Sequence, residues 1–178
     1  ASHVLVSLVS KSLLVADPGD DGVSYRLLET TRGYVQEKLA ATEDAAHVYR
    51  RHAGYCVGLA QSAAIELEEG QAQRWRERNF RKIDDVRAAL TWTLRDRGDV
   101  ELGATLAANS AALFFGLWMT QEYMQWLERA IEALPATALE SKLEMQLCLE
   151  FGHSCIALRG GSPEGLVALL RGAAIARP

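Results

Sequence analysis

The chain has 178 residues, of which 49% are hydrophobic and 24% are charged, a composition typical of globular proteins. It excludes collagen, intrinsic disorder and a disulfide scaffold, and no apolar run approaches the ~20 residues of a bilayer-spanning helix. Since 23 acidic residues outnumber 19 basic ones, for a net charge of −4, non-specific phosphate binding is a poor candidate for the main function. Because helical patterns run into both ends of the chain, we expect a fragment of a longer polypeptide.

The N-terminal segment predicts one short helix followed by a hairpin. Residues 3–10 have helical apolar spacing, and two β-rich runs, 12–17 and 23–29, flank a Pro-Gly-Asp-Asp-Gly turn. A helix followed by a hairpin is typical of the back half of a winged helix, in which the hairpin (about 12–29) is the wing. We therefore assign residues 1–41 to the C-terminal part of a winged-helix element and a linking helix.

The rest of the chain has helical spacing throughout. We expect Thr30 or Thr31 to cap the first of these helices and Thr42 or Asp44 to cap the second. Short polar connections favour an antiparallel α-helical array over residues 42–178. The predicted helices are 30–41, 42–68 (ended by Gly70), 71–78, 83–95, 99–117, 120–134, 138–159 and 163–176.

The same spacing predicts which side chains are buried in the first two of these helices. In the first helix, Tyr34 and Val35 lie on the expected buried face. In the second helix, the apolar stripe includes Tyr55, Cys56 and Leu59.

The C-terminal part repeats itself, because residues 121–135 align with residues 164–178. A large apolar residue, a small residue three positions later and a proline at the end form the second-helix pattern of a tetratricopeptide (TPR) repeat. The aligned pairs are Leu127 with Leu170, Ala130 with Ala173, Ile131 with Ala174, and Pro135 with Pro178. The predicted fold class is therefore all-α, an antiparallel helical array with TPR-like helix pairs, preceded by a winged-helix remnant with one β-hairpin.

Three cysteines are spread along the chain, and two interpretations are open. A zinc site could combine His52, Cys56, Cys148, His153 and Cys155, because each near pair could share a helix face. The chain has no CxxC or HExxH motif, and both pairs lie within apolar helical patterns. We favour reduced, buried thiols and predict no metal.

Catalytic motifs are not evident in the sequence. Ser154 follows His153 directly, so the two side chains would point in different directions on a helix. The paired carboxylates at 68–69 and 84–85 lie near helix ends in charged surroundings, which favours solvated faces. There is no phosphate-binding loop, and the glycines at 160–161 are typical of a helix end. We predict no enzymatic activity and no cofactor in this chain.

Two segments have features that bear on nucleic-acid binding. Residues 74–82 combine five basic side chains with Trp75 and Phe80, which could stack on bases. Glu77 dilutes this charge, and aromatic residues at such positions are more often core anchors, so we favour a structural surface. Residues 1–11 are too apolar for a recognition helix, which disfavours direct DNA binding by this fragment.

Four segments together resemble a known family. Residues 8–17 and 25–39, with the motifs LVSKSL and LLET, are similar to the winged-helix end of signal-transduction NTPases of the STAND class. Residues 83–108 resemble the helical pair that follows that element, and residues 114–135 resemble the TPR-like helices that come next. The resemblance covers nearly the whole chain, in order.

This resemblance implies a bacterial cytoplasmic transcriptional regulator with a nucleotide-binding switch and a helical sensor region. The chain would hold the end of the switch's winged helix and the start of the sensor array, while ATP or ADP would bind a missing upstream module. Related switches place a His-Asp pair over the nucleotide where this chain has Leu28 and Glu29, so the chain departs from the family pattern there.

The implied function is non-catalytic control of the NTPase switch. The expected partners are the intramolecular NTPase module and an inducer or partner protein, with no membrane partner. No ligand or partner surface is assigned to particular residues. The alternative is a free-standing helical scaffold for protein–protein interaction or homo-oligomerisation, which would dimerise on its own.

Overall fold

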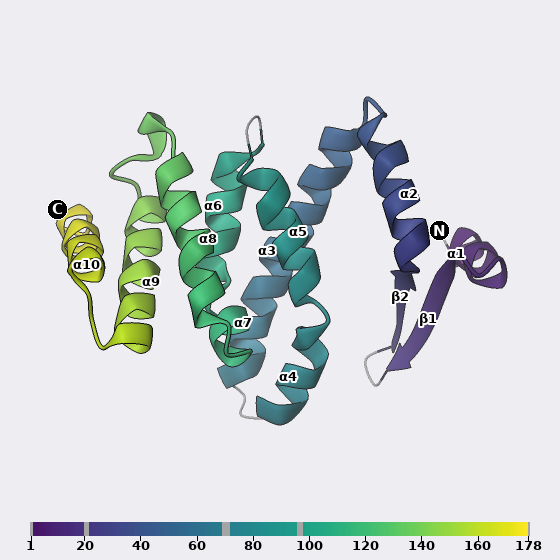
Figure 1. The fold of residues 1–178 in the computed structure, drawn as a ribbon, viewed down its shortest axis with the longest axis horizontal. Helices are drawn as coiled ribbons and strands as arrows, with labels where there is room; N and C mark the ends of the chain where they lie inside the picture. Colours follow the sequence, from purple (N-terminus) through teal and green to yellow (C-terminus); the bar gives the residue numbers. More distant parts are fainter. Residues whose placement is uncertain (1, 20–21, 69–71, 96–97, 178) are drawn as a thin grey trace. The chain divides into compact units, whose positions relative to one another are not determined.

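The computed structural model describes residues 2–19, 22–68, 72–95 and 98–177 (Figure 1). Within these ranges it contains ten α-helices, one 3-10 helix and one two-stranded antiparallel sheet, which confirms a mostly helical fold with a single hairpin. The chain divides between His47 and Val48 into two compact units, which are described separately. The expected functional boundary between residues 41 and 42 stays a prediction.

Unit 1 contains the hairpin. Leu14 is paired with Leu27 at the open end of the hairpin, and Gly19 is paired with Gly22 at its tip. Gly22 has a φ of 120°, a backbone conformation that favours glycine. The strands thus continue into the segment predicted as the turn. The elements of this unit are α1 (Ser2–Ser10), β1 (Leu14–Gly19), β2 (Gly22–Leu27) and α2 (Glu29–Ala40).

The predicted caps Thr30 and Thr31 of the first long helix are wrong, and so is Thr42 for the second. The alternative for the second helix, Asp44, directly precedes Ala45, where that helix begins, and stays a prediction. Helix α2 begins after Leu28, which makes no side-chain cap hydrogen bond, so neither Thr30 nor Thr31 is its N-cap. The Thr42 hydroxyl donates to the carbonyl of Leu39 at 2.7 Å and therefore closes α2 instead of opening the next helix. A hydroxyl that donates to a carbonyl of the preceding turn in this way is not available to cap the N-terminus of the following helix.

Unit 2 is a helical array in which most helices pack on the next one in the chain (Figure 1). Helix α6 also contacts both α8 and α9. In Figure 1, α9 lies between α8 and α10. Every helix in the described ranges falls short of the length and apolar character needed to cross a bilayer. The elements are α3 (Ala45–Glu68, within this unit from Val48 onward), α4 (Ala72–Phe80), α5 (Ile83–Thr93), α6 (Val100–Asn109), α7 (Ala111–Gly116), α8 (Thr120–Ala133), a 3-10 turn (Ala136–Ala138), α9 (Lys142–Arg159) and α10 (Pro163–Ile175).

The core of unit 2 confirms only part of the predicted burial. In α3, Cys56 and Leu59 are buried as expected, whereas Tyr55 is exposed because the buried side of the helix runs through Ala53 and Ala60. In unit 1, Tyr34 and Val35 of α2 are also exposed.

The helix predicted over 99–117 is interrupted at Ser110, which separates α6 from α7. Its hydroxyl donates to the Leu106 carbonyl at 2.7 Å, and this local bond accompanies the end of α6. Helix α7 then closes on Trp118, whose φ is 62°, and the amide of Met119 donates to the Phe114 carbonyl at 2.7 Å. This is the Schellman arrangement, in which the left-handed position is usually glycine.

The end of α9 follows the predicted signal, because Gly160, with a φ of 68°, ends the helix. The cap of α10, Ser162 ahead of Pro163, is a finding of the structure. Helices α8 and α10 begin at aligned positions of the internal repeat, but their aligned side chains differ in environment. Leu127 is fully buried, whereas Leu170 is 61% exposed. The predicted helix stop at Gly70 and the aligned Pro178 lie outside the described residues.

Candidate partner-binding groove

A groove of about 290 Å³ is lined by residues of α8, α9 and α10. These three helices follow one another at the C-terminal end of unit 2 (Figure 1). The floor of the groove is apolar and its rim is charged. The lining residues are Glu128, Ile131 and Glu132 of α8, Glu144, Cys148 and Phe151 of α9, and Glu164, Val167, Ala168 and Arg171 of α10.

Helix α8 forms one wall because of its amphipathic spacing. Its core side carries Leu127 and Ala130, both fully buried, which pack into the interior of unit 2. The helical period then brings Glu128 and Glu132, four residues apart, together on one face, with Ile131 beside them at the groove. The sequence of this helix thus presents one apolar and two acidic side chains to the opening.

The opposite wall is set by a close approach of α10 to α9. A Cβ atom on Gly152 would lie 2.4 Å from Cγ of Leu169, and one on Gly165 would lie 2.6 Å from Cβ of Cys155. Both glycines are therefore required by packing, because any side chain would push the two helices apart. This glycine spacing is the sequence signal that could have indicated the tight α9–α10 pair.

An ion pair ties the two helices together at one lip of the groove. The Arg171 guanidinium donates from Nε to Oε1 of Glu144 at 2.9 Å and from Nη2 to Oε2 at 3.1 Å. The same carboxylate accepts a hydrogen bond from the Glu140 amide at 2.6 Å, while the Ser141 hydroxyl accepts from the Glu144 amide. The hydrogen bonds from Arg171, and to a smaller extent the one from the Glu140 amide, lower the pKa of Glu144, although its side chain is only 8% exposed and burial acts in the opposite direction. Arg171, the cation among the described lining residues, is thus already paired with Glu144.

The other three carboxylates at the rim make no ion pair with any described part of the chain. Glu164 lies in the first turn of α10, where a backbone amide and the Ser162 hydroxyl lower its pKa, with a smaller contribution in the same direction from the charge of Arg159. Glu128 and Glu132 face it from α8. The groove therefore combines an apolar floor with a net negative rim.

The proposed zinc ligands do not converge. His52 and Cys56 share a face of α3, with 3.7 Å between Nε2 and Sγ, while Cys148, His153 and Cys155 are on α9. No group of three or more His, Cys, Asp or Glu side chains in the described ranges is arranged to hold a metal. All three cysteines are free and buried, and burial raises the pKa of Cys56 to about 12.

The considered catalytic pairs also have separate environments. The Ser154 hydroxyl is buried and donates to a carbonyl one turn back on α9, whereas His153 is exposed. Asp84 accepts a hydrogen bond from an arginine on its own helix, and Asp85 lies 4.0 Å from a histidine of α3. Of the pair at 68–69, the second residue lies outside the described residues.

The basic segment 74–82 forms α4 and the turn after it. Trp75 is a core anchor, as predicted: its indole donates to the Ala63 carbonyl at 2.8 Å, and its ring lies against Gly116. Phe80 is 60% exposed, so the same prediction is wrong for this residue.

A second cleft, of about 390 Å³, lies beside α3 and includes Gly54, Ser62 and Lys82. Its charged lining has both signs, since it includes Glu66 as well as Lys82. The Glu66 carboxylate is also paired with Arg78, at 3.3 Å. This cleft is larger than the α8–α10 groove but has a more polar surface and no uniform charge. The α8–α10 groove is therefore the stronger candidate for selective binding.

Comparison with known proteins gives a regulatory context. No protein-family model and no solved structure matches the chain. It is 36% identical over 128 residues to proteins named "Putative HTH-type transcriptional regulator" from Mycobacterium bovis and from two strains of Mycobacterium tuberculosis. The match covers 72% of this chain but only 14% of each relative. The chain is thus similar to one segment of much longer proteins named as helix-turn-helix transcriptional regulators.

Proposed function

We propose that the chain is a non-catalytic regulatory region of a bacterial transcriptional regulator, and that its helical array binds an inducer or partner protein. The observation that carries this proposal is the 36% identity over 128 residues to proteins named as HTH-type transcriptional regulators. The open groove over α9 supports it, because apolar concave surfaces with a few placed charges are typical binding sites.

In this proposal, the array controls an NTPase switch elsewhere in the full polypeptide, where ATP or ADP binds. Ligand binding to the array shifts the switch only if the ligand binds one of the switch's two states more tightly than the other. Moving such an equilibrium from 1:99 to 99:1 requires a preference of about 10⁴-fold. The array would therefore need a surface that binds its ligand specifically; non-specific adhesion would not be enough.

The architecture of the proposal has two parts. Unit 1 is the end of the switch's winged helix, supported by the order of α1 and its following hairpin. Unit 2 is the beginning of a TPR-like sensor, supported by the aligned starts of α8 at Thr120 and α10 at Pro163. The regulator works in the cytoplasm and contacts DNA through a different domain.

The test is to sequence the gene on both sides of the region that encodes residues 1–178 and then to delete codons 48–178 in frame. We expect a phosphate-binding loop upstream and a helix-turn-helix domain in the same reading frame. The deletion should change both the transcript profile of the host and the ATPase rate of the purified full-length protein.

A short open reading frame without an NTPase would contradict the proposal. A purified chain that dimerises at micromolar concentration would then support the alternative, a free-standing scaffold. Sedimentation velocity of the 178-residue chain measures this directly.

A further inference from the structure

The charge and shape of the α8–α10 groove restrict what can bind there. We propose that the groove takes a cationic segment of a partner protein, which seats one large apolar side chain against Phe151 and Val167 and places Lys or Arg side chains at Glu128, Glu132 and Glu164. This inference rests on the proposed function, because it names the chemistry of the partner that the array would bind.

The apolar part of the groove fits a single anchoring side chain. Cys148 and Phe151 form a buried floor, and Val167 stands 66% exposed on the wall above it. The volume of about 290 Å³ is at the small end of the roughly 300–1,000 Å³ of small-molecule sites. A peptide anchor uses such a space well, while the rest of the peptide contacts the rim.

The charged rim of the groove favours a positively charged partner. Glu128 and Glu132 lie on one wall and Glu164 on the other, while Arg171 is occupied by two hydrogen bonds to Glu144. A cationic segment can meet three carboxylates without breaking an existing ion pair. An acidic segment would be repelled by the same rim, which gives the groove its specificity.

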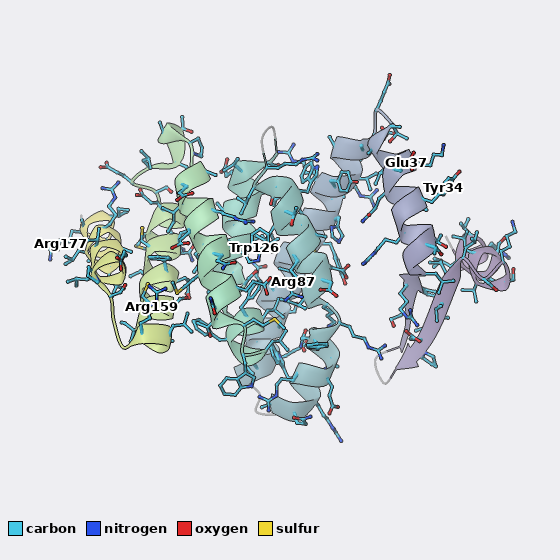
Figure 2. All side chains as sticks on the ribbon, in the orientation of Figure 1. Tyr34, Glu37, Arg87, Trp126, Arg159 and Arg177 are labelled. Atoms are coloured by element: carbon cyan, nitrogen blue, oxygen red, sulfur yellow. The ribbon has the colours of Figure 1, made fainter. Side chains whose placement is uncertain are left out.

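The test selects short random peptides displayed on phage against the full 178-residue chain, with counter-selection against the double variant E128K/E132K. Both positions are exposed on α8, so the variant should keep the fold, which circular dichroism and thermal unfolding verify. The matched control is E37K/E43K, which makes the same change in net charge on exposed positions of unit 1 (Glu37 is labelled in Figure 2).

We expect the selected peptides to carry Lys or Arg on both sides of a Leu, Phe or Trp. A synthetic copy should bind at least about tenfold more weakly to E128K/E132K and equally well to E37K/E43K. Binding should weaken as salt is raised, because the rim is exposed to solvent. Val167→Ser should weaken binding without changing its salt dependence.

Several results would overturn the inference: selection of acidic or uncharged peptides, no selection at all, or equal affinity for E128K/E132K. Self-association of the chain that E128K/E132K abolishes would identify a second copy as the occupant and would also overturn it. None of these results depends on transcription, so the deletion experiment above can still support the regulatory function if the groove inference fails.

Discussion

Arg87 on α5 binds Glu122 on α8 through two parallel hydrogen bonds, from Nε to Oε1 at 2.7 Å and from Nη2 to Oε2 at 2.6 Å (Arg87 is labelled in Figure 2). Glu122 also accepts a hydrogen bond from the Trp126 indole at 3.2 Å, and Arg87 donates to Asp84 at 2.8 Å. This network joins two helices that are separated by α6 and α7 in the chain. It therefore links α5 to α8, the helix that forms one wall of the groove.

Replacing Arg87 with methionine should lower the free energy of unfolding by about 1 kcal/mol, because a bidentate pair is lost but its arginine is 35% exposed and screened by water. Urea denaturation measures the change. Arg51→Met is the control, since Arg51 is an exposed residue of α3 and should change stability by less than about 0.5 kcal/mol. Equal effects of the two variants would show that the Arg87–Glu122 pair contributes nothing.

The same pair should make stability depend on pH. Hydrogen bonding to Arg87, with a smaller contribution from Trp126, lowers the pKa of Glu122 below that of an unfolded glutamate. The stabilisation is therefore complete above the unfolded value of about 4.3 and is lost as the pH falls through the lower folded value.

The difference in unfolding free energy between wild type and Arg87→Met should thus shrink between neutral pH and about pH 3. Burial raises the pKa of Glu150, so protonation of this group at low pH stabilises the folded state in both proteins. Comparing wild type with Arg87→Met removes this contribution from the difference. Urea titrations at both pH values give the difference. A constant difference would contradict the interpretation.

Two helical glycines should respond in opposite directions to alanine substitution. In Gly116→Ala, the new Cβ would lie 2.4 Å from the Trp75 ring, and the resulting shift should destabilise the protein by about 1–3 kcal/mol. In Gly54→Ala, nothing lies within 4 Å, and the higher helix propensity should stabilise it by about 0.5–1 kcal/mol. Urea denaturation measures the change in unfolding free energy of each variant. If both variants were stabilised or both destabilised, the packing argument would be refuted.

Glycine should be a more stable replacement for Trp118 than alanine. It has a φ of 62° at the end of α7 and is 82% exposed, so little burial offsets its strained backbone. Trp118→Gly should be more stable than Trp118→Ala by about 1 kcal/mol, since both lack the indole but only glycine accepts this conformation freely. Thermal unfolding compares the two. An alanine variant as stable as the glycine variant would rule out backbone strain at this position.

The features that the sequence predicted correctly depend on few neighbouring residues. The hairpin follows from two β-rich runs around Pro18 and Gly22, and the end of α9 follows from Gly160. In each case the backbone preference of the residues themselves selects the conformation. Such signals can be read without knowing what lies nearby.

Local signals failed where two short-range preferences compete. Thr30, Thr31 and Thr42 all have hydroxyls suited to an N-cap, yet Leu28 precedes α2 and Thr42 closes it. Ser110 lies inside a continuous helical pattern but accompanies a break. In both cases the hydroxyl donates to a carbonyl three or four residues back in its own helix, a local alternative that the spacing of apolar residues does not express.

The groove was decided by the tertiary structure alone. Its ten lining residues come from three helices, and Glu144 and Arg171 are 27 positions apart in the chain. Each of the four glutamates has the pattern of an ordinary solvated helix residue. They share one rim only because Gly152 and Gly165 allow α10 to approach α9 closely. Contact between the helices therefore creates the apolar floor and the negative charge around it, which no single helix could provide.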